Sequence, residues 1–152
     1  MNSQFWSTPG EIIVRWVAFL PVFIIVVMVA TFIARFMAEM YKPEVYAMIE
    51  ETGTFGDYYI NGPLLMLVLT IVPFTMAIFL SSIVCPNPDI GYGVSVAICL
   101  ALLGISIYLL VVRDLPTGKV SSIVVQMVGL LISLAMSRQQ IQDIVGNTKG
   151  GI

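Results

Sequence analysis

Four long runs of apolar residues divide this 152-residue chain, and their lengths constrain its fold more than any other feature. The hydrocarbon core of a bilayer is about 30 Å thick, and an α-helix needs about 20 apolar residues to cross it. The runs cover residues 16–33, 63–84, 91–112 and 120–136. The last run has only 17 residues, but the long side chains of Lys119 and Arg138 at its ends can reach the interfaces. We therefore expect an integral membrane protein with four transmembrane helices.

Local signals at the ends of these runs set the expected helix boundaries. A proline close to the start of a run, preceded by a capping or turn residue, is typical of a helix N-terminus. The predicted transmembrane helices cover about residues 12–38, 63–84, 90–112 and 118–137 of a single membrane domain that comprises residues 1–152. The last helix is expected to extend over about 138–146, with Gly146 as its stop, before a tail over 147–152.

The segment 39–62 is the only sizeable connection between the runs. It contains Pro43 and Gly53, residues that favour a helix start and a helix end, so we expect a short helix over about 43–52. Its apolar residues share one face, which is typical of a helix lying on the membrane surface. The predicted fold is therefore an all-α integral membrane fold with four transmembrane helices in an up-down bundle and one short interfacial helix in the first loop.

A glycine-aromatic stretch follows the predicted short helix and carries Tyr58 and Tyr59. Tyrosine is enriched where a protein crosses the membrane–water interface, so one interpretation is an aromatic belt. Tyrosine is also favoured in protein–protein interfaces, so the alternative is a docking surface for another membrane protein.

Small residues recur at every fourth position in three of the predicted transmembrane helices. Such ladders allow close approach of helix backbones in lipid. We therefore expect them to form packing seams or partner contacts, and we expect Gly129→Leu and Ala97→Leu to disturb packing. The ladders are Ala30, Ala34 and Ala38 in the first helix, Gly93, Ala97 and Ala101 (with Gly104 close by) in the third, and Gly129, Ser133 and Ser137 in the fourth.

Gln126 is the only side-chain amide in the middle of any apolar run. An unpaired amide in hydrocarbon costs several kcal/mol, so this side chain is expected to face protein or water. One hypothesis is a hydrogen bond to a neighbouring helix or to another copy of the chain. The alternative is a polar contact in a pore or a ligand niche.

Two prolines, Pro21 and Pro73, lie inside the runs. Each removes a backbone hydrogen bond and crowds the carbonyl four residues earlier. The simpler interpretation is a kink, and the functional one is a hinge or a ligand niche. Thr70 and Thr75 flank Pro73, and we expect one of them to satisfy the carbonyl that it frees.

The chain contains no histidine, and only 11% of its residues are charged. It therefore lacks the commonest metal ligand and the usual general base near neutral pH. The interiors of the apolar runs carry no Asp, Glu, Lys or Arg, whereas coupled transporters usually place such residues near the bilayer midplane. The two cysteines, Cys85 and Cys99, are expected to be free thiols, since roughly 12 Å of helix separates them in depth. We expect no catalytic, cofactor-binding or metal-binding residues.

These features favour a non-catalytic accessory, assembly or scaffolding subunit that acts through helix–helix contacts. An oligomeric small channel or passive transporter is the alternative, and an interfacial membrane enzyme is the second alternative. The expected partners are the lipid bilayer and other membrane proteins or a second copy, and the net charge of −2 argues against nucleic acid. The expected location is a bacterial cytoplasmic membrane, with both termini on one side. The cytoplasmic side is preferred because the first loop is acidic.

Overall fold

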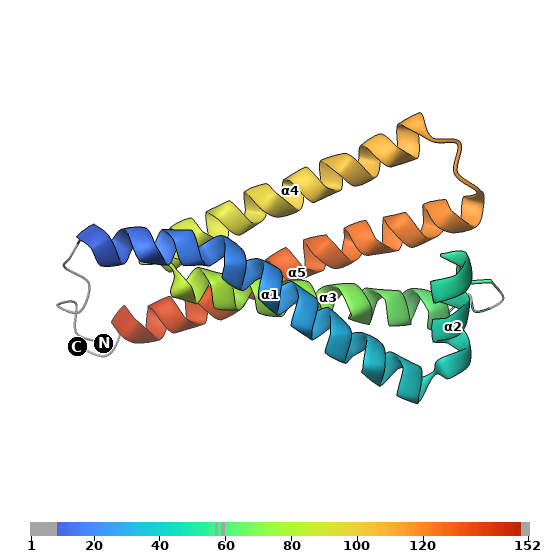
Figure 1. The fold of residues 1–152 in the computed structure, drawn as a ribbon, viewed down its shortest axis with the longest axis horizontal. Helices are drawn as coiled ribbons and strands as arrows, with labels where there is room; N and C mark the ends of the chain where they lie inside the picture. Colours follow the sequence, from blue (N-terminus) through green and yellow to red (C-terminus); the bar gives the residue numbers. More distant parts are fainter. Residues whose placement is uncertain (1–8, 57, 59, 150–152) are drawn as a thin grey trace.

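The computed structural model describes residues 9–56, 58 and 60–149, and throughout this part of the chain all regular structure is helical. Its helices are α1 (Pro9–Tyr41), α2 (Pro43–Thr52), α3 (Asn61–Val84), α4 (Pro88–Val112) and α5 (Thr117–Lys149). Helices α1, α3, α4 and α5 are each long and apolar enough to cross a membrane. Figure 1 shows these four lying lengthwise beside one another, with α2 at the end opposite the start of α1.

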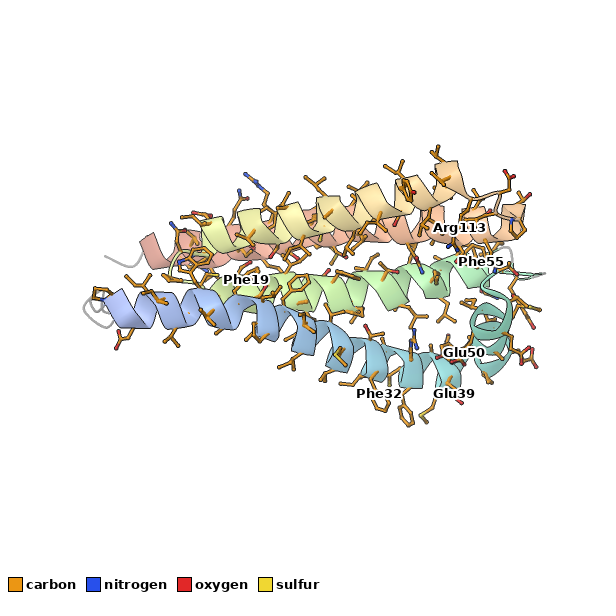
Figure 2. The ribbon with its side chains drawn as sticks, turned by 45° about the horizontal axis from the view of Figure 1, so that its top comes forward. Phe19, Phe32, Glu39, Glu50, Phe55 and Arg113 are labelled. Carbon is orange, nitrogen blue, oxygen red and sulfur yellow. The ribbon has the colours of Figure 1, made fainter. Side chains whose placement is uncertain are left out.

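The core lies among the four long helices, and α3 contacts each of the others. Phe19 and Phe23 of α1 stack on one another, and Phe23 also meets Phe74 of α3 edge to face. Phe19 faces the interior, whereas Phe32, further along α1, points outward and is 73% exposed (Figure 2). The main buried cluster comprises Phe23, Ala77, Ile78, Cys99, Leu103, Leu130 and Leu134.

Helices α3 and α5 approach each other closely at Gly129. A Cβ atom added to Gly129 would lie 2.9 Å from the Cβ of Thr70, so the missing side chain lets the two helices approach. The Ser133 and Ser137 hydroxyls donate to the carbonyls four residues earlier in α5, at 2.8 and 2.7 Å. They also lie 3.3 and 3.4 Å from the Ile71 and Thr75 carbonyls of α3. Such three-centre hydrogen bonds join the helices and keep both serine hydroxyls paired.

The turn between α3 and α4 is short because two local features hold it. The Asn87 side chain accepts a hydrogen bond from the Asp89 N–H at 3.0 Å, which caps the start of α4. A Cβ added to Gly91 would lie 3.0 Å from Sγ of Cys85, so glycine allows the first turn of α4 to pack on the end of α3.

Gly53 ends α2 in the left-handed conformation, with φ of 62°, and its N–H donates to the Ile49 carbonyl. The segment that follows packs against the starts of two long helices. Phe55 lies against Gly62 of α3 (Figure 2), and Thr54 lies against Gly118 of α5. The loop is thereby held to the bundle rather than left extended in solvent.

Helix α3 continues through Pro73, but the flanking threonines do not act as expected from the sequence. The Thr70 hydroxyl donates to the Met66 carbonyl at 2.9 Å, and Oγ1 of Thr75 is buried without a hydrogen-bond partner. Neither bonds the carbonyl of Leu69, which is the one that a proline at position 73 frees. Helix α3 therefore stays continuous through the buried Pro73 without a hydrogen bond from either threonine to that carbonyl.

The end of α5 also differs from the expectation. The helix passes through Gly146 and ends at Lys149, so residues 147–149 are helical and are not part of a tail. Among the glycines that the structure describes, only Gly53 and Gly56 have positive φ. Gly146 therefore lacks the left-handed conformation by which a glycine commonly ends a helix.

We predict that Gly129→Leu lowers the free energy of unfolding by about 1–3 kcal/mol, the usual cost of overpacking a core. Ala97 is exposed on α4, so Ala97→Leu should change it by less than about 0.5 kcal/mol. Thermal unfolding in a mild detergent, followed by circular dichroism, compares the two variants. An equal loss of stability in both variants, or no loss of stability in Gly129→Leu, would contradict the close packing of α3 on α5.

Candidate partner-contact surface

A stripe of small residues runs along the outer side of α4. The inward side of α4 carries the buried residues Ser95, Cys99 and Leu103. At 3.6 residues per turn the four stripe positions lie on the opposite side of the helix, and all four are exposed. A Cβ added at the first or the last position would meet nothing within 4 Å. We define this α4 stripe as Gly93, Ala97, Ala101 and Gly104.

Larger apolar side chains border the α4 stripe. Leu100 and Ile105 are each 56% exposed, and Tyr108 near the end of α4 is 62% exposed. Small residues between taller ones leave a shallow depression in which the backbone of another helix can approach closely. None of the helices that the structure describes lies in it, because α4 meets α3 and α5 through its opposite side.

The small residues of α1 and α5 lie in different surroundings. In α5, Gly129 and Ser133 are buried against α3, as described above. In α1, Ala30 and Ala38 are buried and Ala34 is half-buried. These three alanines line a groove between α1 and α3 whose volume is about 950 Å³.

Gln126 lies on the same side of α5 as Ser133, two turns earlier, yet its side chain is exposed. Figure 1 shows α4 and α5 diverging toward the turn that connects them, and Gln126 lies in that half of α5. Its amide has no hydrogen-bond partner within the portion of the chain that the structure describes. An amide that faces hydrocarbon without a partner is costly, so this position favours contact with a polar group outside the chain or with water.

Tyr58 is half-buried, and its hydroxyl donates to Oε2 of Glu44 at 3.3 Å. This contact ties the loop back to α2, so this tyrosine stabilises the local fold. Tyr59 lies outside the described residues. Tyr41, at the end of α1, is 79% exposed and remains available to the interface or to a partner.

The two cysteines are free and buried. Burial raises the pKa of the Cys85 thiol, and the nearby charge of Arg15 opposes this in part. A raised pKa disfavours the reactive thiolate, which is the opposite of what a catalytic cysteine needs. Within residues 9–56, 58 and 60–149, no three His, Cys, Asp or Glu side chains gather where they could hold a metal ion.

The outward direction of the α4 stripe and the exposure of Gln126 are the features that sequence alone did not distinguish. A ladder of small residues has the same spacing whether it faces its own bundle or a partner. The apolar residues beside the α4 stripe also do not indicate which side of α4 faces outward, because both sides of this helix are apolar in sequence.

Comparison of the chain with protein-family models, with curated protein sequences and with solved structures gives no match in any of the three.

We predict that neither native cysteine reacts with a membrane-permeant maleimide in mild detergent, because Cys85 and Cys99 are 2% and 0% exposed. Gly93→Cys should add one reactive thiol, since a side chain there meets open space. Intact-mass measurement before and after unfolding counts the labels, and unfolding should make every thiol reactive. Labelling of the folded wild-type chain, or an unreactive Gly93→Cys in a monomer, would contradict this arrangement.

Proposed function

We propose that this chain is a non-catalytic membrane protein that serves as an accessory, assembly or scaffolding subunit. It would bind other membrane proteins, or further copies of itself, through the α4 stripe. The observation that carries this proposal is the outward direction of that stripe, which leaves Gly93 and Gly104 facing open space. In lipid, helices associate through close backbone contact and van der Waals packing, and such a stripe provides the surface for both.

The chemistry of the sequence favours contact over catalysis or coupled transport. The chain has no histidine and no charged residue within the interior of its apolar runs. Proton- and ion-coupled transporters usually depend on charged residues there. An interfacial enzyme is the least favoured of the three functions considered, because no arrangement of side chains described above resembles a catalytic site.

A second candidate function is an oligomeric small channel or passive transporter. The exposed amide of Gln126 favours it, because several copies could place this side chain along a polar path. The same amide is equally suited to a hydrogen bond with a partner helix, so it does not distinguish the two functions, and the α4 stripe supports the contact role.

We also propose that the four long helices cross a bacterial cytoplasmic membrane as an up-down bundle, with both termini in the cytoplasm. Helix α2 would then lie on the outer surface. The first loop is sizeable and acidic, as loops on the outer side commonly are, which favours this orientation. The basic residues divide almost evenly between the two sides and do not oppose it.

The α4 stripe is tested by affinity purification in mild detergent. We expect the wild-type chain to recover partner proteins or its own copies, and Ala97→Leu or Ala101→Leu to reduce that recovery about tenfold by blocking backbone approach. Ala135→Leu is the matched control, because Ala135 is also exposed but lies on α5. A wild-type chain that purifies as a lone monomer, or equal losses in Ala97→Leu and Ala135→Leu, would refute the contact role.

Flux measurements in liposomes separate the channel from the accessory role. A channel requires a single oligomeric species with flux above that of empty liposomes, and Gln126→Leu should then change the flux without changing the oligomer mass. The contact role predicts no flux above that of empty liposomes with the wild-type chain or with Gln126→Leu.

The proposed orientation predicts that a tag placed after Ile152 is labelled by an impermeant reagent only once the membrane is permeabilised. For a Gram-negative source the experiment is done in spheroplasts. Labelling of the tag before permeabilisation would reverse the orientation.

A further inference from the structure

We propose that the groove between α1 and α3 binds one anionic phospholipid, with an acyl chain along the groove and the headgroup phosphate at Lys42. We name this the α1–α3 groove, and its volume is about 950 Å³. This inference goes beyond the contact role and does not depend on it, because the groove lies between α1 and α3 and the α4 stripe is on a different helix. Figure 1 shows α1 and α3 crossing and then diverging toward α2, and this divergence opens the groove.

The α1 side of the groove contains a ladder of alanines among larger apolar residues. Ala30, Ala34 and Ala38 lie one turn apart and contribute no bulk beyond a methyl group. The α3 side carries larger apolar residues, among them Leu64, Val68 and Val72, which are 55%, 52% and 41% exposed. An alanine ladder opposite branched side chains leaves space along the helices rather than a closed seam.

The length and the apolar lining of the groove suit an acyl chain. Its lining on α1 runs from Ile25 to Lys42, which at 1.5 Å per residue is about 25 Å of helix. An apolar, laterally open groove of this length, between two helices of spanning length, matches a lipid tail.

The charge at one end of the groove favours an anionic headgroup. Lys42 is the only charged residue in the lining, and it lies with Tyr41 and Asn61 at the end next to α2. These three side chains offer an ammonium, a hydroxyl and an amide at the level where a phosphate would sit. The remaining lining residues are all apolar, so polar chemistry is confined to this end.

Glu39 and Glu44 lie outside the lining of the groove. Glu39 lies on the side of α1 that faces away from α3 (Figure 2). The carboxylate of Glu44 accepts the hydrogen bond from Tyr58 and is directed toward the loop. Within the lining, the charge that a headgroup would meet is therefore that of Lys42.

Native mass spectrometry of the full chain in mild detergent tests the proposal, with phosphatidylglycerol and phosphatidylcholine as probes. We expect a one-lipid adduct with phosphatidylglycerol that is retained in preference to phosphatidylcholine. Lys42→Gln should weaken phosphatidylglycerol binding about fivefold, the effect of removing one basic residue near a lipid surface. Ala34→Phe and Val68→Phe should each remove the adduct by filling the groove.

Matched controls act on other surfaces. Lys119→Gln removes a cation from the same end of the bundle, and Ala97→Phe adds an aromatic ring on the α4 stripe, and both should bind lipid as the wild type does. Circular dichroism checks that each groove variant is folded. One folded variant of the pair Ala34→Phe and Val68→Phe is sufficient for the test. Three results would each overturn the proposal. The first is equal retention of the two lipids by the wild type, and the second is unchanged phosphatidylglycerol binding in Lys42→Gln and in the folded filling variant. The third is a dimer that forms in place of the lipid adduct.

Discussion

The close contact between α3 and α5 is the constraint on which the rest of the structure depends. Gly129 removes the side chain that would separate these helices, and Ser133 and Ser137 bring hydroxyls that bond within α5 while reaching α3. Both interhelical contacts join residues 62 positions apart, so the two helices run in the same direction and keep one register. In lipid there is little hydrophobic force between helices, so close packing and such hydrogen bonds carry much of the association.

With α3 and α5 held together, α1 and α4 pack on them over only part of their lengths. Helix α1 meets α3 through Phe23 and Phe74 and then diverges toward α2. Helix α4 is held near its start, where the Tyr92 hydroxyl donates to the Leu134 carbonyl at 2.9 Å, and diverges toward its other end. Divergence of α1 opens the α1–α3 groove, and Gln126 is exposed in the half of α5 where α4 and α5 diverge.

The α1–α3 groove and the α4 stripe differ in chemistry, so each suits a different occupant. The α1–α3 groove is apolar and carries Lys42 at one end, which suits a lipid. The α4 stripe is a shallow depression made of small residues, which suits another helix. A subunit that binds both a lipid and a partner helix requires no reactive side chain, and the absence of histidine and of charge within the apolar runs is consistent with such a role.

Local sequence was sufficient to predict four long apolar helices and the short helix α2, because apolar length, proline starts and the Gly53 stop act through neighbouring residues. Local sequence was not sufficient to predict the end of α5. That helix continues through Gly146, which does not adopt the positive φ that commonly ends a helix. The destinations of the three small-residue ladders depended on tertiary structure: Gly129 packs on α3, Ala34 lines a groove and Ala97 faces outward. Spacing along a helix defines which residues share a side, but only the crossing of neighbouring helices determines what that side meets.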